Sequence, residues 1–184
     1  SLTGTTIDNA TAAITGSNGN VTWTATNDAA TSTINQAITA KTLTLADGKF
    51  TNGGAIYTAD SVVISGDTDV LASDFVTPSL VITSTNDVTV GTIDEGTAGE
   101  GFVVAGSGAS GKINITTDAN ATNAGTATIY TGSGADTITA NDTNTTFVIS
   151  SGGNATTETI NIDEAATGSA VNSGGGDDDL DIED

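Results

Sequence analysis

The chain has 184 residues, of which 23 are acidic and only 3 are basic, so its formal net charge is -20. Because phosphate groups are bound by basic surfaces, this charge excludes nucleic acids and anionic membrane surfaces as natural partners and favours divalent cations. Cysteine, methionine and histidine are all absent, which excludes disulfides, zinc-finger sites and cysteine or histidine nucleophiles.

Apolar residues occur in short β-branched runs between glycine, asparagine, aspartate and serine, a pattern typical of strands and turns. Trp23, the only tryptophan, is expected in the core or at an end cap, with carbohydrate stacking as the alternative. Residues 31–40 are the best place for a short helix. Pro78 is expected in the turn before a strand, and residues 94–101 and 117–123 are expected to be loops. No apolar run approaches a membrane span, so we expect no membrane insertion.

The apolar runs return at a regular interval. The residues that end each run before its polar turn lie about 20 residues apart. These anchors are Ala25, Leu45, Ile64, Ile82, Val104, Tyr130, Ile149 and Val171. A strand and a turn at a fixed phase predict an all-β parallel β-solenoid, or β-roll, with Ile64, Ile82, Val104, Ile149 and Val171 buried along one core. An antiparallel β-sandwich is the alternative, because two strands per interval fit its spacing too.

The domain prediction follows from this period. We expect one elongated β-domain over residues 1–184, with residues 1–40 as a possible end cap and residues 41–184 as stacked coils. Valine, isoleucine, leucine and phenylalanine make up about a fifth of the chain, near the limit below which highly charged chains stay disordered. Folding is therefore expected to depend on a metal ion or on neighbouring chains, and the chain is expected to be a segment of a larger protein.

Two glycine-rich stretches, residues 131–139 and 173–181, share the pattern [Thr/Ser]-Gly-x-Gly-x-Asp-x-[Ile/Leu]-x. Glycines permit a tight turn that directs its carbonyl oxygens inward. The aspartate adds an anionic oxygen, and Ca²⁺ takes about six to eight oxygen ligands. The predicted metal ligands are the side chains of Asp136 and Asp178, the turn residues Gly132, Gly134, Gly174 and Gly176, and the acidic residues Asp177, Asp179 and Asp181. Plain glycine turns without an ion are the alternative, and a third glycine stretch, residues 151–154, lacks the aspartate.

This nonapeptide resembles the calcium-binding repeat of RTX proteins, a family of parallel β-rolls. The resemblance covers about 20 residues, and the first glycine of the repeat is replaced by Thr131 in one copy and by Ser173 in the other. It implies calcium ions held between stacked turns. The overall composition is similar to that of RTX-type surface-layer proteins of Gram-negative bacteria, in which calcium folds the rolls and joins subunits into a lattice.

The composition and the motifs bear on three classes of function. The first is a secreted structural component of a bacterial surface layer or extracellular matrix at the cell surface, which calcium folds and assembles with further copies into a lattice or filament. The second is a calcium-dependent adhesin or carbohydrate-binding module that contacts cell-surface polysaccharide. The third, an enzyme, is not expected, because the absence of arginine and the presence of only three lysines leave no means of stabilising charge on a substrate.

Overall fold

The computed structural model of the chain describes residues 2–3, 6–7, 14–24, 31–94, 99–117, 125–141, 144–152, 156–163 and 168–183. These residues form sixteen strands and no helix. The first eight strands are β1 (Leu2–Thr3), β2 (Thr6–Ile7), β3 (Ile14–Thr24), β4 (Thr31–Ile34), β5 (Ile38–Thr51), β6 (Ile56–Val76), β7 (Ser79–Ile82) and β8 (Val88–Asp94). The remaining strands are β9 (Val103–Ala105), β10 (Ile113–Thr117), β11 (Thr126–Tyr130), β12 (Thr137–Ala140), β13 (Thr146–Ser150), β14 (Thr159–Asp163), β15 (Ala170–Asn172) and β16 (Asp179–Glu183).

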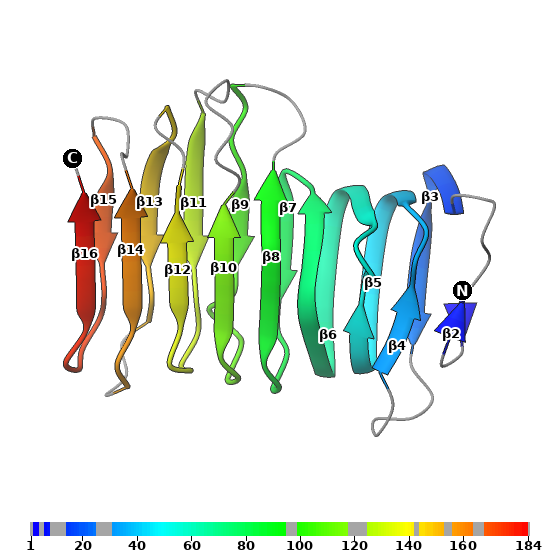
Figure 1. Cartoon of the computed structure of the whole chain (residues 1–184), viewed down its shortest axis with the longest axis horizontal. Coiled ribbons are helices and arrows are strands. Elements are labelled where there is room, and N and C mark those ends of the chain that lie inside the picture. Colours follow the sequence, from blue (N-terminus) through cyan, green and yellow to red (C-terminus); the bar gives the residue numbers. More distant parts are fainter. Residues whose placement is uncertain are drawn as a thin grey trace.

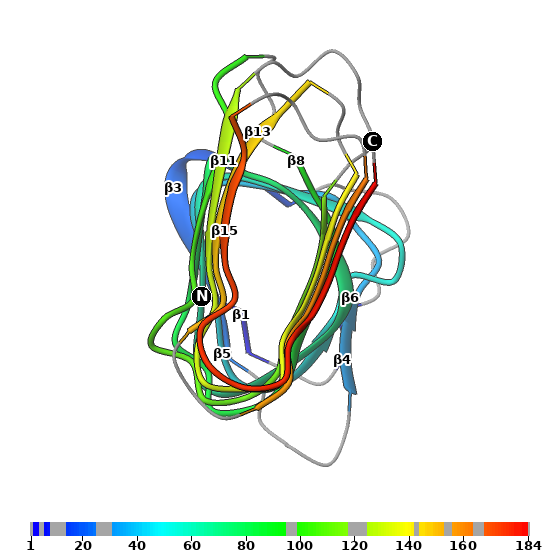
Figure 2. The ribbon, with the colours of Figure 1, turned by 90° about the vertical axis from the view of Figure 1, so that its left-hand side faces the viewer.

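The strands lie side by side along the long axis of the molecule (Figure 1) and wind into a solenoid with two facing walls (Figure 2). From β6 onward one wall has the order β6-β7-β9-β11-β13-β15 and the other the order β6-β8-β10-β12-β14-β16. The long strand β6 belongs to both walls, because Val62 pairs with Leu80 of β7 and Val70 pairs with Val88 of β8. Every pair of described strands is parallel, so the predicted parallel β-solenoid is confirmed and the antiparallel sandwich is wrong.

The core is built from rows of apolar side chains that continue from coil to coil. On one wall the register joins Leu80, Val104, Ile129, Ile149 and Val171 in succession. On the other wall it joins Val90, Ile115, Ile138, Ile160 and Leu180. Buried and half-exposed residues alternate along strands such as β10 and β13, because successive side chains point to opposite faces of a strand.

Most of the predicted core residues lie where the period placed them. Ile64, Ile82, Val104 and Ile149 are buried in the same wall, whereas Val171 is half-buried and packs against the core. Tyr130 ends β11 before the turn, as the period places it, but it is exposed and its neighbour Ile129 is the buried residue of this run. The physical reason is the alternation of the strand, which turns every second side chain to the solvent.

The expected helix over residues 31–40 is wrong. The segment instead forms β4 and the start of β5, separated by a bend at Gln36. Thr31 and Thr33 of β4 pair with residues of β5, and this parallel pairing outweighs a weak local preference for helix. Strands β3 and β4 thus both join β5 as parallel neighbours, in the manner of the later coils.

Two single-residue expectations are confirmed. Trp23 is fully buried and meets the ring of Phe50 edge-on, with 4.7 Å between the ring centroids. Pro78 lies in the turn between β6 and β7. Of the two predicted loops, residues 95–98 and 118–124 lie outside the described residues, as does Asp184 of the acidic C-terminal run.

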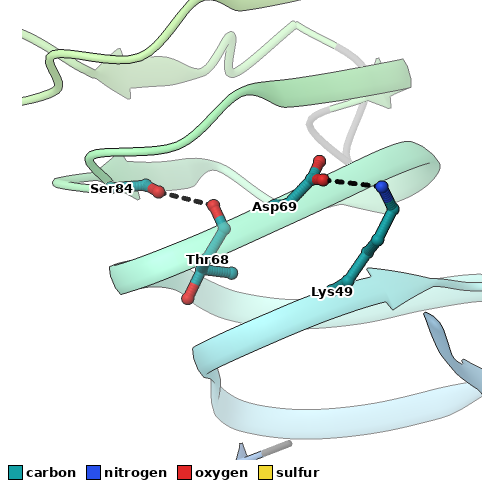
Figure 3. Close-up of polar contacts among 4 residues, drawn as sticks. All are labelled: Lys49, Thr68, Asp69 and Ser84. Carbon is teal, nitrogen blue, oxygen red and sulfur yellow. Dashed lines mark hydrogen bonds and ion pairs between the residues drawn. The ribbon is translucent and has the colours of Figure 1, made fainter. Parts of the chain in front are cut away.

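Polar contacts between neighbouring coils tie the outer faces together. Lys49 and Asp69 are register partners on β5 and β6, and the Lys49 Nζ lies 2.9 Å from the Asp69 Oδ2 (Figure 3). The Ser84 hydroxyl donates a hydrogen bond to the backbone carbonyl of Thr68 in the preceding coil (Figure 3). Acids on these coils are therefore partnered within the fold, and the Thr92 hydroxyl likewise donates to Asp74 at 3.0 Å.

Candidate metal site

The two glycine motifs form turns between the two walls of the solenoid. The first turn connects β11 to β12 and the second connects β15 to β16. Between them lies the turn from β13 to β14, so the two predicted metal-binding turns are separated by one complete coil. The register joins Thr137 to Thr159 and Thr159 to Asp179. The residues immediately before these three are Asp136, Glu158 and Asp178, and they form a row of acids on three successive coils, here called the acidic row.

Asp136 is the most enclosed of the predicted ligands. Its side chain is 1 % exposed, and Oδ1 accepts a hydrogen bond of 2.8 Å from the Ile113 amide in the preceding coil. Burial raises the pKa of the Asp136 carboxyl, against the opposing effects of the Thr131 hydroxyl, the Ile113 amide and the Lys112 charge. Oδ2 is buried without a hydrogen-bond partner, and the buried Thr131 hydroxyl has no partner of ordinary geometry either. One carboxylate oxygen is therefore left over for a ligand.

Glu158 holds the middle of the acidic row. It is 1 % exposed, and its Oε1 accepts a hydrogen bond of 2.7 Å from the Thr156 hydroxyl. Oε2 is buried and has no hydrogen-bond partner. Burial, the contact with the Asp178 carboxyl and the charge of Asp136 raise the pKa of the Glu158 carboxyl, with the Thr156 hydroxyl opposing them. The environment therefore disfavours a free negative charge at this position.

Asp178 closes the row at its C-terminal end and is half-buried. Its Oδ1 accepts a hydrogen bond of 3.3 Å from the Glu158 amide. Contacts with the side chains of Glu158 and Ser173 hold the pKa of the Asp178 carboxyl below its usual value. Asp136 and Asp178 thus share one geometry, because each accepts a backbone amide from the preceding coil.

The predicted glycines allow the turns to stack in direct backbone contact. A Cβ added to Gly132 would lie 2.0 Å from the Ala109 carbonyl oxygen, and one added to Gly134 would lie 2.4 Å from the Gly111 carbonyl oxygen. Gly176 faces a carbonyl oxygen of the preceding coil in the same way, and the amide of Gly174 donates to Asn172 Oδ1 at 3.1 Å. Carbonyl oxygens of the preceding coil therefore lie against these glycines in the turns that precede the acidic row, and calcium binds oxygen ligands of this kind. Close stacking of the coils is by itself a sufficient reason for glycine at Gly132 and Gly134.

The remaining predicted ligands do not join the acidic row. Asp177 is exposed in the turn, and Asp179 and Asp181 are exposed on β16, where they alternate with Leu180 and Ile182. Over the described part of the chain, no group of three or more histidine, cysteine, aspartate or glutamate side chains is arranged to hold a metal ion. A site at this row would therefore use one or two carboxylates together with hydroxyl and carbonyl oxygens.

Sequence reasoning missed Glu158. Glu158 lies seven positions after Ser151, whereas Asp136 lies five positions after Thr131, so an alignment on the glycines passes over the glutamate. The strand that follows carries the usable signal, because an acid, a β-branched residue and isoleucine recur in Asp136-Thr137-Ile138 and in Glu158-Thr159-Ile160. Aligning the coils on these strands would have found the third acid.

The described residues define a parallel β-solenoid whose stacked turns carry the acidic row, with Asp136 and Glu158 buried and Asp178 half-buried. No protein-family model matches the chain, and neither a curated protein nor a solved structure is similar to it. In the part of the chain that the structure describes, no helix is long and apolar enough to cross a membrane.

Proposed function

We propose that this chain is a secreted structural segment of a bacterial surface layer or extracellular matrix, and that calcium folds and assembles it. The observation that carries the proposal is the pair of buried carboxylate oxygens, Asp136 Oδ2 and Glu158 Oε2, that have no hydrogen-bond partner. An unpaired buried carboxylate is costly, and a bound cation removes that cost.

The residues present fit a calcium ion. Asp136 would bind one ion and Asp178 another through carboxylate oxygens, with the carbonyl oxygens beside Gly132 and Gly134 at the first ion and the one beside Gly176 at the second. A bound calcium ion would supply positive charge to turns whose own side chains are acidic. The turns would then be held against one another, and the net charge of -20 would be reduced.

The shape and surface support a structural role. Each coil buries its apolar row against its neighbours, so the solenoid is an extended rod rather than a scaffold around one cavity. Outer faces are linked by hydroxyl and carboxylate contacts between successive coils, such as Thr85 to Asp67 and Thr92 to Asp74. Such a rod serves as a repeating building unit, and we propose no catalytic role for it.

An adhesin or carbohydrate-binding module is the second candidate, and one observation favours it. Tyr130 and Val103 are both exposed on the outer face of neighbouring strands β11 and β9, and Val103 also lines a hollow together with Pro78 and Phe102. A sugar ring can stack on such an exposed aromatic side chain. Trp23 and Tyr57 are buried in the core and offer no second platform. Glycan-array binding that Tyr130→Ala abolishes would favour this candidate.

Thermal unfolding with calcium and with a chelator tests the structural proposal. A ligand that binds only the folded state stabilises it by about 2.7 kcal/mol when its free concentration is about a hundredfold above its dissociation constant. For a chain of this size that raises the unfolding midpoint by about 5–10 °C. We expect this rise for the parent chain and a smaller one for Asp136→Asn. Asp67→Asn changes the same charge at an exposed acid outside the acidic row and should behave like the parent.

Calorimetry on the same samples measures calcium binding directly and decides whether the proposed function holds. The parent chain should bind calcium, and Asp136→Asn should reduce the number of ions bound. If the parent binds no calcium and unfolds at the same temperature in calcium and in chelator, the proposed function is wrong.

A further inference from the structure

Glu158 differs from the other two acids of the acidic row in the direction of its carboxyl group. Asp136 and Asp178 each accept a backbone amide from the preceding coil. Glu158 instead lies beside Asp178 of the following coil, because the residues after them are register partners and the Glu158 amide donates to Asp178 Oδ1 at 3.3 Å, and the two carboxyl groups interact. Two acidic side chains on adjacent coils therefore face each other at the turns that lead into β14 and β16.

The contact between the Glu158 and Asp178 carboxyl groups needs a further group to join them. Ionised carboxylates only accept hydrogen bonds, so two of them cannot bond to each other without a proton or a cation between them. Glu158 is 1 % exposed and its Oε2 has no hydrogen-bond partner among the protein atoms, so the protein itself leaves this oxygen unsatisfied. The surroundings are rich in hard oxygen atoms, since the Thr156 hydroxyl contacts Glu158 and the Ser173 hydroxyl contacts Asp178. These are the donors that Ca²⁺ prefers.

We propose that Glu158 and Asp178 together bind a calcium ion that clamps the coil of β13 and β14 to the coil of β15 and β16. Asp178 then binds its ion jointly with an acid of the preceding coil, not with its own glycine turn alone. This inference rests on the proposed function for the identity of the ion, but it concerns a separate ion from the one at Asp136. Two carboxylates and neighbouring oxygens suffice for it, in agreement with the absence of a described three-acid cluster.

The clamp explains why the turn from β13 to β14 keeps an acid although it has lost the glycine motif. In that turn Glu158 lies two residues later than the motif would place an acid, yet the register of the following strand restores it to the acidic row. The longer side chain of glutamate reaches across to Asp178, whereas Asp136 and Asp178 each reach back to an amide.

Calcium titration of the full chain by calorimetry tests the clamp, with Glu158→Gln as the decisive variant. Glutamine has the same size, can still accept from Thr156, and can donate an amide hydrogen to Asp178, so the coil should remain folded. We expect Glu158→Gln to lose one bound ion or to weaken one site by at least tenfold. Asp178→Asn should do the same, and the double variant should lose no more than either single one. Glu100→Gln removes the same charge from an exposed glutamate and should titrate like the parent.

The outcomes separate this inference from the proposed function. If Glu158→Gln titrates like Glu100→Gln while Asp136→Asn loses an ion, the clamp is wrong and the calcium-dependent function stands. If the parent chain binds no calcium, both are wrong. Should Glu158→Gln fail to fold, Glu158→Asp keeps the test decisive, because the clamp requires the shortened side chain to weaken the ion shared with Asp178 while the ion at Asp136 is retained.

Discussion

At the scale of single residues, the stacked turns show why glycine recurs before each acid. Gly132 and Gly134 lie so close to carbonyl oxygens of the preceding coil that neither has room for a side chain. Gly108, in the turn of the preceding coil, is exposed, and a Cβ there would meet only the Thr83 methyl group at 3.5 Å. The glycine motif therefore permits the close spacing of stacked turns and also fixes the position of an acid.

We predict that Gly132→Ala destabilises the fold and that Gly108→Ala does not. The added methyl group of Gly132→Ala must displace a backbone carbonyl, and such overpacking costs about 1–3 kcal/mol. At Gly108 the contact is ordinary, and the loss of backbone freedom in the unfolded chain offsets any small strain. Urea unfolding of both variants in chelator measures the difference without the contribution of calcium. Equal stability of the two variants would contradict the close approach at Gly132.

The sequence predicted only part of the acidic row. Asp136 and Asp178 could be found because their glycines lie at fixed distances before them. Glu158 could not be found in this way, because turn length varies between coils and only the pairing of the strands restores the alignment. The exposure of each aspartate could not be predicted from the sequence either. Asp177, Asp178 and Asp179 are neighbours in one acidic run, but only Asp178 turns towards the preceding coil.

At the scale of the strand, alternation and coil period predicted the fold well. Both properties are local consequences of parallel pairing, since each strand must present every second side chain to the core and each coil must repeat the last. The errors arose where phase or context mattered. The period marks Tyr130 as the end of an apolar run but does not show that Ile129 is the residue that faces the core, and residues 31–40 form strands instead of the expected helix because they pair with β5. Neither the phase within a short run nor a long-range pairing can be read from one segment alone.

We predict that the same truncation has different costs along one core row. Ile138 is fully buried, so Ile138→Ala removes buried methyl groups and should lower the free energy of unfolding by about 2–5 kcal/mol. Leu180 lies two coils further along this row and is 46 % exposed, so Leu180→Ala should cost about 1 kcal/mol or less. Chemical unfolding at one protein concentration below the onset of association makes the comparison. Similar losses for both variants would show that Leu180 is covered in solution.

At the scale of the whole molecule, the solenoid is highly acidic along its length and open at one end. β15 and β16 have described partners on one edge only, and Leu180 and Ile182 are exposed there. Unpaired strand edges and exposed apolar side chains favour association with another sheet. The surrounding acids, among them Asp177, Asp179 and Asp181, oppose it by repulsion.

We predict that millimolar calcium drives self-association and that sodium chloride of equal ionic strength does not. Salt screens exposed charges over about 10 Å at about 0.1 M ionic strength, which permits contact without directing it. Calcium can instead bridge carboxylates of two chains at defined positions. Sedimentation velocity in both salts measures the effect, and replacing Leu180 and Ile182 by serine should weaken it. A chain that binds calcium and remains monomeric would contradict the lattice and give the adhesin candidate more weight.

The unequal turns have a consequence for engineering. The segment from Ser151 to Glu158 is two residues longer than its counterparts on both sides, yet the strands before and after it keep their register with the neighbouring coils. The length of that turn can therefore change without changing how the strands of the two walls pair. A short guest peptide placed after Gly152 should leave the pairing of the flanking strands intact, and several such rods in an array would present it at regular spacing.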